Sequence, residues 1–148
     1  MPQALVCGSI SAKSEGKTEL MMVSLEGVAR AGEFLAASII EARGSRASHV
    51  AIYGTDLWVE TPSGRILRVQ VKTASRPSPA RWGSLTSDYR FMKTASGKGH
   101  SQPDLYFLVA LDLQLMLVFD KMATGGTRIS ADAFSIDAQE YGIATHLF

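Results

Sequence analysis

An aspartate, a glutamine and a lysine in the middle of the chain have the types and spacing for phosphate chemistry. Asp56 opens a short apolar run, a Pro-Ser-Gly turn follows at 62–64, and the next run carries Gln70 and Lys72. Side chains alternate between the faces of a strand, so Gln70 and Lys72 project to one side and the valines between them to the other. Folding the two runs into a hairpin brings Asp56 beside them. A carboxylate, an amide oxygen and an ammonium group clustered in this way suit a site where Mg²⁺ and a phosphate meet.

A predicted helix upstream carries a further acid. From about Leu20 to Arg43, apolar residues recur at three- and four-residue steps, and Gly44 follows as a stop signal. At ~100° per residue, Glu33 falls at the edge of the apolar arc. A carboxylate at that position is expected to be partly buried where the helix meets the sheet.

The remaining patterns predict further strands and a second helix. Two apolar runs late in the chain are separated by only a short link, so we expect them to pair as a hairpin. The expected elements are strands at about 48–53, 56–60, 65–73, 105–111 and 115–119, an edge strand at 127–130, and a last short helix capped by Ser130 and reaching about Tyr141.

The long polar stretch from Ala74 to Gln102 is rich in Pro and Gly and is too long for a simple connection, which favours a functional or mobile segment. The stretch contains several basic residues and a single acid, Asp88, so the basic side chains are expected to form a local positive surface for nucleic-acid phosphates. Two of its aromatic residues, Trp82 and Phe91, are expected in the core rather than stacked on bases. The candidate nucleic-acid-binding residues are Arg76, Arg81, Arg90, Lys93 and Lys98.

A helix glutamate, a hairpin aspartate and a strand lysine follow one another in an order that resembles a known family. The segment Gly32-Glu33, then Asp56, then Gln70-x-Lys72 is similar to the PD-(D/E)xK nuclease signature. It resembles the variant in which Gln replaces the second acid, as in Holliday junction resolvase-like and intron-encoded endonucleases. The resemblance covers about residues 22–120.

This resemblance implies an α/β fold with a restriction-endonuclease-like core, in which a mixed sheet of about four or five strands is flanked by helices. It implies Mg²⁺ as cofactor, with Mn²⁺ as a substitute, and no organic cofactor. A neutral amide binds a divalent cation more weakly than a carboxylate does, so metal affinity should depend mainly on Asp56 and Glu33. The implied catalytic residues are Glu33, Asp56, Gln70 and Lys72, and the implied metal ligands are Asp56, Gln70, Glu33 and the carbonyl oxygen of Val71.

Several other features have simpler interpretations. Taken singly, Asp56 could simply be the first residue of a strand, and Lys72 could be a solvated residue at a strand edge. His49 and His146 are expected to be structural. Pro103-Asp104 has no Gln-x-Lys after it on a neighbouring strand, so Asp56 is preferred. Gly125-Gly126 is expected to form a turn rather than a phosphate-binding loop, because no Lys-Ser or Lys-Thr follows.

Composition indicates one globular domain. The chain has 148 residues, of which 46% are hydrophobic and 20% charged, enough for one well-buried core. We expect a flexible arm at 1–19 and a single nuclease-like domain at 20–148. The net charge of only +1 means that any phosphate-binding surface must come from local clustering.

Cysteine usage and the N-terminus predict a cytoplasmic protein. The single cysteine, Cys7, cannot form an internal disulfide, which suits a reducing compartment. The start of the chain lacks the pattern of a secretion signal, and no apolar run reaches membrane-spanning length. No membrane partner is therefore expected.

Together these features predict a metal-dependent endonuclease that hydrolyses DNA phosphodiester bonds. A structure-directed cut, as at a Holliday junction, is favoured because the sequence contains no recognisable base-reading module. One such site cuts one strand, so a homodimer is expected for a duplex. Two alternatives stay open: a nucleic-acid-binding or assembly protein that retains the fold without the chemistry, which Gln70 and the low net charge favour, and a nuclease that acts on RNA.

Overall fold

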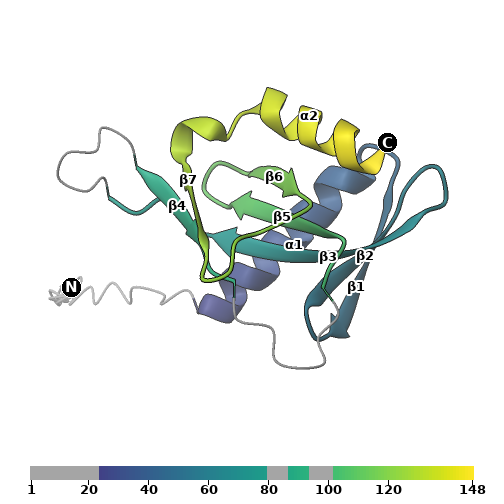
Figure 1. The fold of residues 1–148 in the computed structure, drawn as a ribbon, viewed down its shortest axis with the longest axis horizontal. Helices are drawn as coiled ribbons and strands as arrows, with labels where there is room; N and C mark the ends of the chain where they lie inside the picture. Colours follow the sequence, from purple (N-terminus) through teal and green to yellow (C-terminus); the bar gives the residue numbers. More distant parts are fainter. Residues whose placement is uncertain (1–23, 80–86, 94–101) are drawn as a thin grey trace, which may run out of the picture.

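The computed structural model describes residues 24–79, 87–93 and 102–148, so the predicted arm at 1–19 lies outside the described residues. Two helices and a small second sheet pack around a five-stranded sheet (Figure 1). The elements are α1 (Leu25–Glu41), β1 (Arg46–Ile52), β2 (Thr55–Glu60), β3 (Ile66–Ala74), β4 (Asp88–Phe91), β5 (Leu105–Ala110), β6 (Leu115–Phe119), β7 (Thr127–Ser130), a 3₁₀ turn (Ala131–Ala133) and α2 (Ile136–Leu147).

The main sheet is mixed, with the strand order β1-β2-β3-β5-β6. Antiparallel pairing joins β1, β2 and β3, parallel pairing joins β3 to β5, and β5 and β6 form the expected hairpin. The turn between β2 and β3 uses Gly64 at φ 81°, a backbone conformation that favours glycine. The prediction of a mixed sheet of four or five strands flanked by helices is confirmed, and β3 is its central strand.

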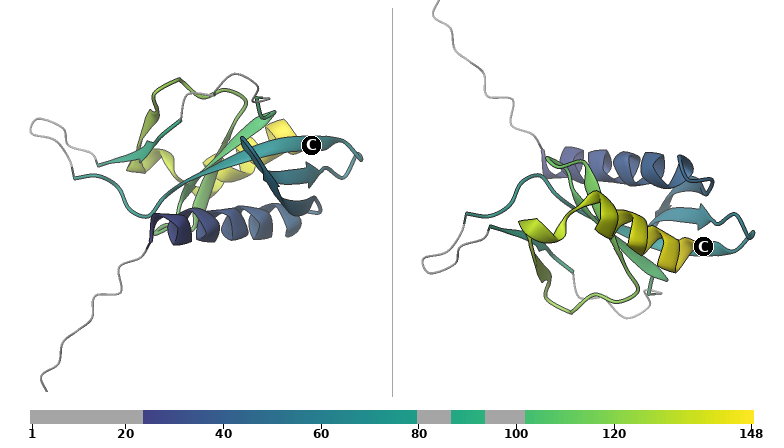
Figure 2. Two further views of the ribbon diagram at one scale, coloured as in Figure 1. Left: turned by 90° about the horizontal axis from the view of Figure 1, so that it is seen from below. Right: turned by 90° about the horizontal axis from the view of Figure 1, so that it is seen from above.

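Strand β5 is buried on both faces and divides the core in two. Its residues Leu105, Phe107 and Val109 belong to the hydrophobic cluster beneath α1. Residues of β6 and α2 complete this cluster. Tyr106 and Leu108 point the other way and pack with β4 and β7. Figure 2 shows α1 lying along one side of the sheet. A fully buried apolar side chain of this size contributes roughly 1.5–3 kcal/mol relative to exposure, so both faces of β5 stabilise the fold.

Helix α1 begins later than the sequence predicted. The Ser24 hydroxyl accepts a hydrogen bond of 3.0 Å from the N–H of Gly27 and caps the helix, which then starts at Leu25 rather than near Leu20. Its end agrees with the prediction, because Gly44 adopts φ 89° shortly after the last turn. The cap therefore fixes where the helix that carries Glu33 begins.

The stretch from Ala74 to Gln102 contains a strand that the sequence analysis missed. Strand β4 pairs antiparallel with β7, and the two form a separate sheet. Residues Thr127–Ser130 are therefore a strand, as predicted, but they pair with β4 and not with the main sheet. Tyr89 and Phe91 of β4 are each about 1% exposed, so the expectation that Phe91 lies in the core is confirmed, whereas Trp82 lies outside the described residues.

The last helix was predicted with the wrong cap and the wrong end. Ser135, not Ser130, caps the helix: its hydroxyl accepts a 3.1 Å hydrogen bond from the N–H of Ala138, whereas Ser130 precedes the 3₁₀ turn and its side chain makes no capping hydrogen bond. The helix continues past Tyr141 to Leu147, because Ile143 and Leu147 are buried in the core beneath α1. His146 lies in its last turn.

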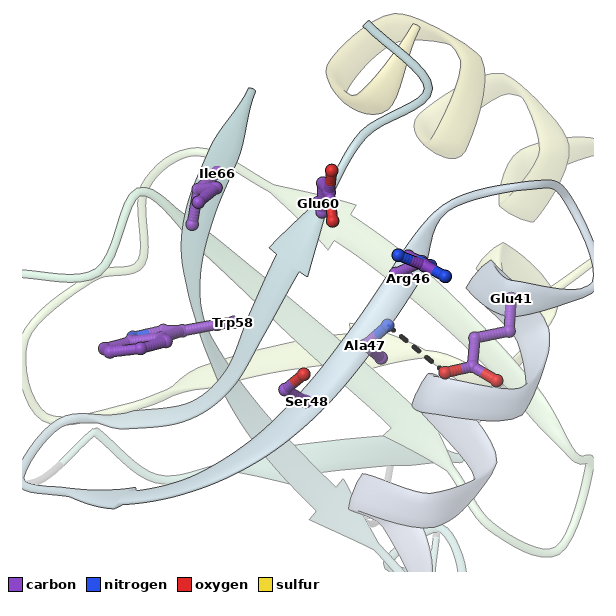
Figure 3. Close-up of a pocket in the computed structure, with 7 residues that line it drawn as sticks. All are labelled: Glu41, Arg46, Ala47, Ser48, Trp58, Glu60 and Ile66. Atoms are coloured by element: carbon purple, nitrogen blue, oxygen red, sulfur yellow. Dashed lines mark hydrogen bonds between the residues drawn. The ribbon is translucent and has the colours of Figure 1, made fainter. Parts of the chain in front are cut away.

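Side chains from the two helices cover the outer edges of the main sheet. Gln139 of α2 is buried, and its Oε1 accepts a hydrogen bond of 3.0 Å from the N–H of Met116 on β6. At the other edge, Oε1 of Glu41 accepts a 3.2 Å bond from the N–H of Ala47 on β1, drawn as the dashed line in Figure 3. Satisfying these edge donors limits pairing with another chain at those positions.

Gly32 allows α1 to lie against the end of β3. A Cβ at this position would lie 1.9 Å from Oγ1 and 2.6 Å from Cγ2 of Thr73, a stiff β-branched side chain. The overpacking should cost about 1–3 kcal/mol, more than the helix propensity of ~1 kcal/mol that alanine gains over glycine. We therefore expect Gly32→Ala to lower the free energy of unfolding by roughly 1–2 kcal/mol, as measured by urea denaturation.

Adding Thr73→Ala to Gly32→Ala removes both contacting atoms of Thr73, and this double variant should recover part of the lost free energy of unfolding. Gly27→Ala is a matched control in the same helix, where a Cβ would meet, among the described residues, the Ser24 hydroxyl at 3.1 Å. A Gly32→Ala protein as stable as the parent would show that α1 can move away from β3 without cost.

No helix in the described parts of the chain is long and apolar enough to span a membrane.

Candidate active site

The candidate site begins where β2 separates from β3. Pairing between these strands runs from the pair of Glu60 with Ile66 to the pair of Leu57 with Val69. One residue further, Oδ2 of Asp56 accepts a hydrogen bond of 2.7 Å from the N–H of Val71 and takes the place of the next backbone partner. The N–H and C=O of a strand residue point to the same neighbour, so the Val71 carbonyl opens on the same side as Asp56. The fork therefore directs a backbone oxygen toward the same side as a carboxylate.

Gln70 and Lys72 line the same pocket on β3, as their alternation predicted. Their register partners on β5 are Tyr106 and Leu108, on the face opposite the core beneath α1. Burial lowers the pKa of Lys72, the charge of Asp56 opposes that shift, and the nearby charge of Lys93 adds to it. Lys72 is therefore a half-buried amine beside a carboxylate.

Burial also raises the pKa of Asp56, which is the largest influence on this carboxyl group. The hydrogen bond from Val71 acts in the opposite direction, and the charge of Glu33 raises the pKa further. Lys72 and His49 lower it by smaller amounts. The net direction means that the folded protein disfavours the ionised form of Asp56, and a bound cation would relieve this cost.

Glu33 reaches the site from α1, in the turn that Gly32 holds against Thr73. Its side chain is 17% exposed, and Oε2 lies 2.8 Å from Nη1 of Arg30 and 3.4 Å from Nδ1 of His49. The His49 contact is short enough for an ion pair but lacks hydrogen-bond geometry, and Nδ1 of His49 has no hydrogen-bond partner among the described residues. One oxygen of Glu33 is thus held by its neighbours.

These side chains line one pocket of about 340 Å³. The structure brings together Glu33 from α1, Asp56 from β2, and Gln70, Val71 and Lys72 from β3. Their catalytic and metal-binding roles stay predictions. The full lining is Ala29, Glu33, Asp56, Gln70, Val71, Lys72, Thr73, Arg90, Phe91 and Met92.

The predicted basic residues divide into three groups. Arg90 lines the pocket itself. Lys93 acts on the pKa of Lys72, and its Nζ donates a 3.2 Å hydrogen bond to the carbonyl of Met122 and lies 5.2 Å from the centre of the Tyr106 ring. Arg76 is exposed beyond the end of β3, whereas Arg81 and Lys98 lie outside the described residues.

Two neighbours of Glu33 were missed by the sequence analysis. Arg30 could have been found, because an acid three residues later on a helix is a common ion-pair spacing. His49, expected to be structural, comes from β1, and its ring lies 4.6 Å from that of Phe34. No local pattern links β1 to α1, so only the fold reveals that contact.

The donor chemistry of the pocket fits Mg²⁺. In the described ranges, no three His, Cys, Asp or Glu side chains gather closely enough to hold a metal ion. The acidic residues that line this pocket are Asp56 and Glu33. Mg²⁺ is commonly held by one or two carboxylates, with waters and substrate phosphates completing its shell. The amide of Gln70 and the Val71 carbonyl add further oxygen donors to the same pocket.

A second hollow, also about 340 Å³, lies at the β1 edge of the sheet beside Trp58 and Ile66 (Figure 3). Its charged lining residues are Glu41, Glu60 and Arg46, so negative charges outnumber positive ones. It contains no lysine and does not include the Asp56–Val71 fork. This hollow is a poor candidate for binding a phosphate.

No protein-family model matches the sequence, and no curated protein matches it. Among solved structures, the chain is similar to the bacterial homing endonuclease I-Ssp6803I, with a TM-score of 0.57 and 17% sequence identity. The similarity covers 72% of this chain and 75% of that one. This chain has a nuclease-type fold. The predicted fold class is confirmed, and at this level of identity the likeness shows the fold alone.

Proposed function

We propose that the protein is a metal-dependent endonuclease that hydrolyses DNA phosphodiester bonds at the pocket around Asp56 and Lys72. The observation that carries this proposal is the fork between β2 and β3, which places a half-buried carboxylate and a half-buried amine in one pocket on a nuclease-type fold. Perturbed pKa values of both groups, in a concave site, are typical of catalytic residues. The arrangement supports assignment to the PD-(D/E)xK branch.

The roles follow from the chemistry of each group. Asp56, the Val71 carbonyl, Gln70 and Glu33 would hold Mg²⁺, which when bound supplies positive charge against the scissile phosphate and makes water more acidic. Lys72 directs its ammonium group at the phosphate or at the attacking water. The hydrogen bond from Arg30 holds one oxygen of Glu33, beside which His49 lies, and this limits the positions that the carboxylate can take.

A structure-directed cut, such as Holliday junction resolution, is the proposed mode of action, and a homodimer is the proposed assembly. A single pocket of this kind serves one strand, so two copies related by a two-fold axis would cut both strands of a duplex or junction. The low overall charge supports binding that is confined to the surface around the pocket.

The test is a cleavage assay with the purified full chain. Labelled duplex, single-stranded and four-way-junction DNA, and a matching RNA, are incubated with Mg²⁺, with Mn²⁺ or with EDTA. The proposal expects metal-dependent cuts in DNA, with the junction cut fastest. Binding without cutting would favour the alternative, a nucleic-acid-binding or assembly protein that retains the fold, and faster cutting of RNA would change the substrate class.

Gln70→Glu should tighten metal binding, because it adds a negative charge to a site for a hard cation. We expect the dissociation constant for Mn²⁺ to fall by roughly 10-fold or more in isothermal titration calorimetry. Gln70→Leu, which removes the oxygen donor, should weaken binding. The control is Gln102→Glu, the same charge change at an exposed position outside the pocket. Unchanged or weaker binding by Gln70→Glu would mean that Gln70 does not face the metal.

A further inference from the structure

The small sheet places two arginines directly opposite each other. In the register of β4 and β7, Arg90 pairs with Arg128, while their neighbours Tyr89 and Ile129 pair on the next rung. Tyr89 and Ile129 face inward and pack in the core between the two sheets. Because side chains alternate, Arg90 and Arg128 project outward together, and both are exposed.

Like charges directly opposite each other across a strand pair are destabilising. Neither guanidinium forms an ion pair with any residue in the described ranges. By contrast, Arg30, Arg43 and Arg68 each have a carboxylate partner within 3.0 Å. The two positive charges therefore lie side by side without a carboxylate at ion-pair distance among the described residues, although Asp88 shares their face of β4, and this arrangement suits binding of an external anion.

The two arginines line a small hollow of about 70 Å³ that adjoins the candidate active site. Arg90 and Met92 line both this hollow and the pocket around Lys72. Figure 1 shows β4 and β7 side by side near the end of β3, the strand that carries Lys72. An anion in the hollow would therefore lie next to a group bound in the active site.

Gly126 lets the turn before β7 pack closely against the end of β4. A Cβ at this residue would lie 2.8 Å from the backbone oxygen of Phe91 and 3.1 Å from the sulfur of Met92, and its φ of 113° also favours glycine. This close contact precedes β7 by one residue and helps to set the register that places Arg128 opposite Arg90. The paired arginines thus depend on a specific turn geometry.

We propose that Arg90 and Arg128 bind one backbone phosphate of the DNA strand that is cut, next to the scissile phosphate. Each guanidinium group donates several hydrogen bonds from a planar set of N–H groups that matches phosphate oxygens. One phosphate between the two arginines would replace their mutual repulsion by attraction. The inference rests on the proposed function for the identity of the strand. It assigns Arg128, outside the basic stretch found in the sequence, a role in directing that strand into the pocket.

The experiment measures DNA binding by the full chain in EDTA, so that it does not depend on cleavage. Fluorescence anisotropy with a labelled 30-base-pair duplex and the matching single strand is recorded over a range of NaCl concentrations. We expect Arg90→Gln and Arg128→Gln each to weaken binding at least ~10-fold at low salt, as for loss of a hydrogen bond between charged groups. Arg46→Gln, in the mixed-charge hollow at β1, is the matched control and should bind as the parent does.

The salt dependence tests whether one phosphate is shared. Each neutralised phosphate contributes about 0.9 to the slope of log K against log salt on a duplex. The double variant should therefore lose about one unit of slope in total. Arg128→Lys, which keeps the charge but not the fork, should keep the slope and lose affinity. Circular dichroism confirms that each variant is folded.

A loss of about two units in the double variant would overturn the shared phosphate, and parental affinity and slope in Arg128→Gln would overturn the site. These outcomes are separate from those of the cleavage assay. A parent that binds DNA through the two arginines but never cuts would remove the proposed function and leave the phosphate site in place. If the parent cuts DNA but the arginine variants bind DNA as the parent does, the phosphate site would be wrong and the proposed function would stand.

Discussion

Asp56→Asn is expected to reduce the rate of DNA cleavage by at least ~100-fold while the protein remains folded. The substitution keeps a side-chain oxygen that can accept the hydrogen bond from Val71, but it removes the charge that would hold the metal. Loss of one charge-stabilising group in a site of this kind costs about 10²–10³ in rate. Single-turnover cleavage with Mg²⁺ measures the loss, and Asp120→Asn, an exposed carboxylate outside the pocket, is the matched control.

The same substitution should make the fold more stable at neutral pH. The pKa of Asp56 is raised in the folded state from its ordinary value of 3.8, so the folded protein binds this proton more tightly than the unfolded chain does. Stability therefore falls as the pH rises past 3.8 and through the folded-state pKa, and above that pKa the cost is fully present. We expect Asp56→Asn to be more stable than the parent at pH 7, and we expect this difference to disappear below the ordinary pKa.

A variant that cuts at the parental rate would remove Asp56 from the site. A variant that loses both activity and stability would indicate a structural role for the charge, since a metal ligand held in an unfavourable environment should become more stable when it is neutralised. The urea midpoint at pH 7 and at pH 3.5, measured for parent and variant, separates these outcomes.

The centre of the fold and the candidate site could be predicted because their signals are local. Alternation along β3 placed Gln70 and Lys72 on one face, and the turn before it fixed the hairpin with β2. The apolar period of α1 placed Glu33 at the edge of its buried face. Each of these inferences needs only the geometry of one element or one turn.

The missed features depend on contacts between segments that are far apart in the sequence. Tyr89 and Phe91 alternate with polar residues as a strand requires, but β4 is short, and it is recognisable as a strand only through its pairing with β7. The contact between His49 and Glu33 likewise needs β1 to be placed under α1. The extent of α2 depended on Ile143 and Leu147 finding a core along β6.

Lys72→Met is expected to reduce cleavage by at least ~100-fold while leaving metal-free DNA binding within a few-fold of the parent. Methionine fills nearly the same volume as the buried stem of lysine, so packing is largely kept and only the ammonium group is lost. Removing one positive group that acts on the developing charge affects the transition state far more than it affects binding of the substrate. Rates come from single-turnover assays, and affinities come from anisotropy in EDTA.

Lys72→Arg then identifies what the ammonium group does. If Lys72 only neutralises the phosphate, the guanidinium keeps the charge and should restore part of the activity that Lys72→Met loses. If Lys72 instead positions the attacking water through a compact group on a flexible stem, arginine should be as inactive as methionine, because its planar fork cannot take the same place. Lys121→Met, at an exposed position outside the pocket, controls for the loss of one positive charge. Equal losses of binding and cleavage in Lys72→Met would instead mean that Lys72 only holds DNA, and catalysis would have to depend on other groups.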